Sequence, residues 1–271
     1  MDHPFLFFDQ NNVWYHPSLT KCNELWNRRD QFGISRRLDW DAMTELNQRD
    51  QLANMLSPPF SRLVNIDRPI YLELTLKFFA TYSYEKPKAS RSPDFQHKKQ
   101  INFRLGDNWH NWAVGRLGRR LGIYTDDEMN SEFFTDQYTF PSEEEQAAFW
   151  ARVAVGPPYD PRVAKASRLR DPLLRVMHHI FSHTIARRLD SFGNCPTPDV
   201  IFLYAIAEGV HIILTARMAE YFVRSSGRTA SSQIHGGQYV TQLAYAMGIM
   251  TDEVVKSLTL VTEGTYVDIR L

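Results

Sequence analysis

The chain has 271 residues, of which 43% are hydrophobic and 23% are charged, and its formal net charge is zero. This composition allows a sizeable core, and it excludes the overall positive field that would by itself indicate nucleic-acid binding. Two cysteines, Cys22 and Cys195, are too few for a disulfide scaffold or for a zinc cluster built mainly from cysteine. A reducing compartment, the nucleus or the cytoplasm, is expected, because the sequence has neither a secretory signal pattern nor an Asn-x-Ser/Thr acceptor.

Residues 1–37 mix aromatic side chains with Asn, Pro and Arg pairs and show no clean period. This pattern predicts a loosely packed N-terminal arm. Asp39 then suits the N-cap of a helix that runs to Leu56. The prolines after Ser57 end that helix, because proline cannot donate the next helical hydrogen bonds.

A further helical pattern follows Asp67-Arg68-Pro69, with apolar side chains at the spacing of one helix face. Glu73 and Lys77 lie four residues apart and are expected to pair on the exposed face. The helix is therefore predicted to bury only its other face, which consists of Leu72, Leu76, Phe79 and Tyr82.

Alternating apolar and polar residues, followed by a glycine turn, predict a short β-hairpin from Ile101 to Trp112. A helical repeat comes next, and Gly122 is placed to end it in a left-handed conformation. From Asp126 to Glu145 the chain holds eight acidic residues and neither Lys nor Arg. This acidic block closes with Ser142-x-x-Glu145, a capping box for another helix.

The most marked helical pattern runs from Asp171 to Val223 and predicts two helices joined by a loop. The first begins at the cap Asp171-Pro172 and presents an apolar face at helical spacing, made of Leu174, Met177, Phe181 and Ile185. The second is apolar on nearly all sides from Val200 to Ala219, which predicts the most buried helix of the molecule.

A membrane span is the rival interpretation of this second helix. Glu208, His211 and Arg217 interrupt it, and a charged side chain at the centre of an inserted helix costs about 2.5–3.5 kcal/mol. We therefore expect no membrane association. The predicted fold is mainly α, a single helical domain around a buried central helix, with one short β-hairpin. In this division residues 1–37 are the arm, 38–250 the helical domain and 251–271 a C-terminal tail.

Basic residues gather just after the acidic block. Seven of them could contact nucleic-acid phosphates, and the basic loop from Lys86 to Lys99 could extend their surface. The alternative is a solvated face that pairs with the neighbouring acids. The candidate nucleic-acid-binding residues are Arg162, Lys165, Arg168, Arg170, Arg175, Arg187 and Arg188.

His179 and His183 lie four residues apart on the first of the two helices, so both rings could face one metal ion, and His178 sits beside them. Packing or partner contact is the favoured interpretation, because a third ligand would have to come from Cys195, His211 or His235. Two carboxylate groups could hold magnesium, but both fall at helix caps or in acidic loops: Asp39-x-Asp41 and Asp126-Asp127-Glu128. Neither a metal nor a cofactor is therefore expected.

Catalytic motifs are missing from the sequence. It contains no Gly-x-Ser-x-Gly nucleophile elbow, no Gly-x-x-x-x-Gly-Lys phosphate loop and no Gly-x-Gly-x-x-Gly dinucleotide fingerprint.

Five stretches carry a resemblance to a known family: Pro69-Ile-Tyr-Leu-Glu-Leu-Thr-Leu-Lys-Phe-Phe-Ala-Thr-Tyr82, Phe103-Arg-Leu-Gly, Gly118-Arg-Arg-Leu-Gly-Ile-Tyr124, Leu174-Arg-Val-Met-His-His-Ile-Phe-Ser-His183 and Gly237-Gln-Tyr-Val-Thr241. Together they resemble the first-open-reading-frame protein of Athila-type plant retrotransposons, over roughly residues 38 to 250. The resemblance implies a gag-like or accessory mobile-element protein with no catalytic residues to carry over. The chain lacks a cysteine-rich zinc knuckle and an Asp-Thr-Gly or Asp-Ser-Gly protease signature.

The expected function is therefore non-catalytic. We expect a plant retrotransposon-derived protein that self-assembles as a homo-oligomer and binds the RNA or DNA backbone without reading its sequence. The alternative is a transposase-like enzyme that uses clustered carboxylates and magnesium.

Overall fold

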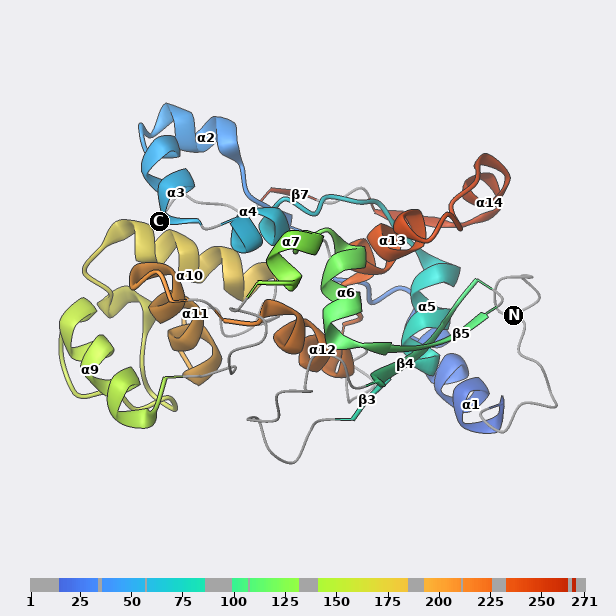
Figure 1. Ribbon diagram of the computed structural model, residues 1–271, viewed down its shortest axis with the longest axis horizontal. Helices are drawn as coiled ribbons and strands as arrows, with labels where there is room; N and C mark the ends of the chain where they lie inside the picture. Colours follow the sequence, from blue (N-terminus) through green and yellow to red (C-terminus); the bar gives the residue numbers. More distant parts are fainter. Residues whose placement is uncertain are drawn as a thin grey trace.

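The computed structural model describes residues 15–33, 36–56, 58–85, 99–106, 108–131, 141–184, 193–210, 212–225, 233–262 and 265–266. The molecule is mainly helical and carries small two- and three-stranded sheets, which confirms the predicted fold class (Figure 1). Within these ranges every helix is too short or too polar to cross a membrane.

The central helix is α5 (Leu72–Thr81), and all of its residues are buried. Helices α1 (Tyr15–Trp26), α12 (Leu214–Ser225) and α13 (Gly237–Ala246) pack around it together with strand β4 (Lys99–Leu105). The prediction that Val200–Ala219 would be the most buried helix is therefore wrong.

The predicted surface pair on α5 is also wrong. Glu73 is 3% exposed and Lys77 is 0% exposed. The Glu73 carboxylate accepts hydrogen bonds from the backbone amide and the hydroxyl of Thr259, at 2.9 and 2.7 Å. These hydrogen bonds satisfy the buried carboxylate. Glu73, which the sequence pattern places on the surface, therefore joins α5 to the C-terminal part of the chain at Thr259.

The expected loose arm is well packed in its described part. Helix α1 lies against α5, and Cys22 and Leu25 on α1 are 0% and 1% exposed. The tail is likewise paired with the rest of the fold. Strand β6 (Leu260–Thr262) runs antiparallel to β2 (Ile70–Tyr71), and β7 (Thr265–Tyr266) runs parallel to β1 (Arg36–Arg37).

The helix predicted from Asp39 to Leu56 is two helices, α2 (Trp40–Glu45) and α3 (Arg49–Met55). Asp39 caps the first as expected, because its carboxylate accepts from the amides of Asp41 and Ala42. The chain then reverses through Asn47, whose φ is +55°, a left-handed value that asparagine tolerates better than most residues. Helix α4 (Pro58–Val64) follows.

The predicted hairpin is confirmed. Strands β4 and β5 (Asn108–Ala113) pair antiparallel, and the short β3 (Ser83–Tyr84) adds a third strand on the other side of β4. Helix α6 (Val114–Leu121) follows and ends at Gly122 in the left-handed conformation, as predicted. Two capping boxes then begin α7 (Asp126–Met129) and α9 (Glu143–Val153).

The last helices surround the second part of the core. Helix α10 (Pro172–Thr184) starts where Asp171 accepts from the amide of Leu173, and it packs against α11 (Thr197–Ala207). The short α14 (Asp252–Ser257) begins after Thr251, whose hydroxyl accepts from the amide of Val254 at 3.3 Å.

The predicted continuous helix from Val200 to Ala219 is broken between α11 and α12. Gly209 has a φ of +63° and takes the chain out of the helix. The hydroxyl of Tyr124 fixes the restart, because it accepts from the amide of Leu214 at 2.9 Å and donates to the carbonyl of Ile212 at 3.2 Å. Both sides of the break remain buried, as their apolar sequence predicts.

Candidate functional site

The segment 162–175 carries five of the seven basic residues singled out in the sequence. Backbone hydrogen bonds hold it on two sides. Next to α9, the amide of Val155 donates to the carbonyl of Arg168, and the amide of Arg170 donates to the carbonyl of Val153. On the other side Lys165 forms an antiparallel bridge with Asn194. The part from Arg162 to Arg170, including the short helix η2 (Ala166–Arg168), is thus fixed in place without being part of a long helix or a sheet, and Arg175 lies in α10.

We refer to four cations of this segment together as the basic surface: Lys165, Arg168, Arg170 and Arg175. The Lys165 ammonium donates to the side-chain oxygen of Asn194 at 2.5 Å, and Arg170 donates to the carbonyl of Arg152 at 3.3 Å. Arg175 is half-buried, and its Nε has no hydrogen-bond partner in the described part of the chain. Among the described residues no carboxylate lies within ion-pair distance of these four, so their charges are not neutralised there.

Arg162 behaves differently from its neighbours. Its backbone and its guanidinium both donate to Asp160, at 2.8–3.0 Å. These hydrogen bonds lower the pKa of Asp160 to about 2, so the pair stays ionised and the charge of Arg162 is balanced locally. Arg187, Arg188 and the loop Lys86–Lys98 lie outside the described residues.

The acidic block does not pair with the basic surface in its described part. Asp126 pairs with Arg119 at 2.7 Å, and Glu128 pairs with Arg62 at 2.5 Å. Partial burial opposes ionisation of Glu128, but hydrogen bonds from Arg62 and from the capped amide of Thr125 outweigh it and lower the pKa of Glu128. Residues 132–140 of the block lie outside the described ranges.

The carboxylates considered for magnesium thus have local structural roles. Asp39 caps α2, while Asp126 and Glu128 belong to the first turn of α7 and pair with arginines. A carboxylate already committed to a cap or an arginine has fewer oxygen lone pairs left for a cation. None of the described structure favours a magnesium-dependent site at these positions.

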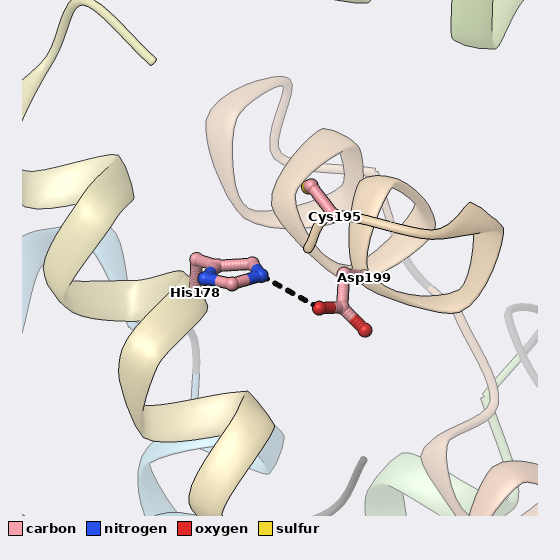
Figure 2. A group of neighbouring side chains, drawn as sticks. All are labelled: His178, Cys195 and Asp199. Carbon is pink, nitrogen blue, oxygen red and sulfur yellow. Dashed lines mark ion pairs between the residues drawn. The ribbon is translucent and has the colours of Figure 1, made fainter. Parts of the chain in front are cut away.

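A second group of side chains lies in the interior, where α10 meets the start of α11. His178, Cys195 and Asp199 each place one potential metal-ligand atom within 4.8 Å of the others, and all three are at most 1% exposed (Figure 2). The Nε2 atom of His178 lies 2.8 Å from Oδ2 of Asp199 and 2.9 Å from the carbonyl oxygen of Asn194. Because both oxygens are acceptors, Nε2 carries the hydrogen in this arrangement.

The sequence pattern indicated His179 and His183 as the metal-binding pair, with Cys195 as one candidate third ligand, whereas the structure brings His178 and Cys195 together. His179 is half-buried, and the side chain of His183 lies outside the part that the structure describes. His211 is also outside it, and the ring of His235 packs against Gly33. The signal that identifies His178 is its spacing: it lies four residues after Leu174 and three before Phe181, on the predicted buried face of α10.

A cysteine, a histidine and an aspartate within 4.8 Å of one another also resemble the catalytic triad of a cysteine hydrolase. Such a triad needs a sulfur that a substrate can reach. Cys195 is 0% exposed, so the described geometry does not support nucleophilic catalysis there.

A cavity of about 410 Å³ lies between α3 and the end of α11. Its lining has amides and apolar side chains but no acid, base or nucleophile: Gln51, Asn54, Met55, Ala205, Ile206, Gly209 and Val210. It therefore offers no general acid or base for a reaction.

Comparison of the chain with protein-family models, with curated proteins and with solved structures finds no match.

Proposed function

We propose that this chain is a non-catalytic, plant retrotransposon-derived protein that binds the backbone of RNA or DNA in the nucleus or the cytoplasm. The observation that carries the proposal is the basic surface, whose four cations have no carboxylate partner among the described residues. The resemblance to Athila-type first-open-reading-frame proteins supports it, since such a protein must meet the nucleic acid of its own element.

The local structure favours contact with phosphates over readout of bases. Direct readout places a helix or a two-stranded ribbon in the major groove. Here Lys165, Arg168 and Arg170 come from an irregular segment with one short turn, and Arg175 comes from the first turns of α10. Phosphate contacts position a protein on nucleic acid without selecting a sequence.

Self-assembly is the second part of the proposal. Two exposed apolar side chains, Val155 and Val163, lie beside the basic surface, with 51% and 53% of their areas accessible. Copies that pack through such side chains would bring several basic surfaces together on one strand. Light scattering after size exclusion, with and without RNA, tests this part, and a monomer under both conditions contradicts it.

Filter binding at low salt tests the binding itself. The wild type and the Arg168→Ala, Arg170→Ala, Arg175→Ala variant are compared on two single-stranded RNAs and two DNA duplexes of unrelated sequence. We expect the wild type to bind both sequences of each kind about equally. The variant should bind about tenfold more weakly, from roughly 0.5 kcal/mol for each of the three charges removed. Equal affinity of the two proteins, or no binding by either, would overturn the proposal.

A further inference from the structure

The group His178, Cys195 and Asp199 has the composition of a zinc site. Cysteine sulfur, imidazole nitrogen and carboxylate oxygen are the three donor types that bind Zn²⁺ in proteins. Calcium and magnesium prefer shells of oxygen alone, so the sulfur and the nitrogen select against them. We propose that these three side chains bind one Zn²⁺ ion, which joins α10 to α11 and to the stretch 193–196 before it.

The backbone holds each donor in place before any ion arrives. The amide of Cys195 donates to the carbonyl of Ala164 at 2.9 Å, and its carbonyl accepts from the hydroxyl of Tyr159 at 3.3 Å. Asp199 lies in the first turn of α11, where the helix dipole favours a negative charge. His178 projects from the buried face of α10 toward Asp199 (Figure 2). A site fixed in this way loses little conformational freedom on binding.

The distances between the ligand atoms indicate how they would rearrange around a bound ion. Two donors bound to one zinc at tetrahedral angles stand about 3.3–3.8 Å apart, given bond lengths of about 2.0–2.3 Å. Nε2 of His178 and Oδ2 of Asp199 are 2.8 Å apart, which is the spacing of a hydrogen bond. Zinc therefore takes the place of the hydrogen on Nε2, which the neutral imidazole then carries on Nδ1, and of the thiol hydrogen of Cys195. Nε2 and Oδ2 move apart by about half an ångström, and one proton, that of the thiol, passes to solvent. The carbonyl oxygen of Asn194 lies 2.9 Å from Nε2, next to the position that the zinc ion would occupy.

Cobalt spectroscopy on the full chain tests the site. Co²⁺ replaces Zn²⁺ in such sites, and a cobalt ion bound to a thiolate gives a charge-transfer band in the near ultraviolet. We expect the band to rise to one equivalent of Co²⁺ and to disappear when Zn²⁺ is added. Zinc at a hundredfold excess over its Kd should also raise the melting temperature by about 5–10 °C. A folded wild type that gives neither the band nor the thermal shift overturns the proposal.

The two cysteines supply matched variants, because Cys22 is also fully buried. Cys195→Ser should abolish the cobalt band and weaken zinc binding by more than about 100-fold, the upper end of the loss from removing an outer-shell partner of a ligand. Cys22→Ala should keep both. Circular dichroism confirms that each variant is folded. If Cys195→Ser is unfolded, retention of the band in Cys22→Ala still assigns the thiolate to Cys195. A band that persists in Cys195→Ser, or that vanishes in a folded Cys22→Ala, contradicts the site.

Discussion

Phe202 on α11 shows how a single ring joins three helices. It is 2% exposed, stacks on Phe181 of α10 at 5.1 Å and meets the edge of Phe60 of α4 at 6.3 Å between ring centres. Aromatic contacts of this kind add to the free energy that burial of the ring contributes.

Phe202→Ala should therefore lower the free energy of unfolding by about 3–5 kcal/mol, the usual cost of removing a fully buried ring. Urea denaturation measures the loss. Tyr204 on the same helix is only half-buried, so Tyr204→Phe serves as a control and should stay within about 0.5 kcal/mol of the wild type. A near-silent Phe202→Ala would show that the ring is not in the core.

Glu128 makes stability depend on pH. Its pKa is lower in the folded protein than in the unfolded chain, because the bonds from Arg62 and Thr125 outweigh its partial burial. The stabilisation is therefore fully present above the ordinary carboxyl pKa and is lost as the pH falls through the lowered value. Glu128→Gln should cost about 1 kcal/mol at pH 7, and the difference from the wild type should shrink below about pH 4.

Denaturation of the wild type and of Glu128→Gln across a pH series measures this difference. Asp127→Asn changes the same net charge at an exposed neighbour and is the control. If the difference in unfolding free energy between the wild type and Glu128→Gln stayed constant from pH 7 to pH 3, the ionised carboxylate of Glu128 would not be the source of the stabilisation.

Two glycines define the helix packing around α12, each for a different reason. Gly209 adopts a φ of +63° at the break after α11, with no atom within 4 Å of where a Cβ would lie. Gly118 on α6 lies so close to α12 that a Cβ there would be 2.2 Å from a methyl group of Thr215. At Gly209 the backbone conformation disfavours other residues, whereas at Gly118 there is no room for a larger side chain.

Substitutions distinguish the two reasons. Gly209→Ala should cost about 1–2 kcal/mol, and Gly209→Asn less, since asparagine tolerates the left-handed region. Gly118→Ala should cost about 1–3 kcal/mol through overpacking, and Gly118→Asn more, because it is larger. Thermal unfolding of the four variants ranks them. The assignment fails if asparagine is the milder replacement at both glycines.

Local signals predicted the elements well where one residue decides the outcome. The cap at Asp39, the capping box at Ser142, the glycine stop at Gly122 and the hairpin from Ile101 to Trp112 are all confirmed. Each depends on hydrogen bonds or backbone angles within a few residues, which the sequence contains directly.

Tertiary contacts explain why some predictions from the sequence are wrong. The charges of Glu73 and Lys77 indicated an exposed face, whereas the partner that accommodates Glu73 is Thr259, far along the chain. The sequence does not reveal the break at Gly209, because the flanking residues are mostly apolar and a glycine within a helical pattern is often tolerated. The group around His178 needed α11 to bring Asp199 to α10, which periodicity along one helix cannot show.

In the segment 162–175, core residues alternate with the cations of the basic surface: Ala164 and Leu169 are each 2% exposed and belong to the core. Backbone pairing with 153–155 and 193–195 holds the segment in place. Changes to the four cations of that surface should therefore leave the fold intact.

The salt dependence of the affinity for nucleic acid distinguishes binding through the basic surface from binding elsewhere on the chain. Each phosphate neutralised releases counterions and adds about 0.7–0.9 to the slope of log affinity against log salt. Arg168→Ala, Arg170→Ala, Arg175→Ala should lower that slope by about 2–3. The control is Arg116→Ala, Arg119→Ala, Arg120→Ala, which removes the same charge from the exposed side of α6 and should lower the slope by less than about 1. Equal slopes for the wild type and both variants would contradict binding through the basic surface.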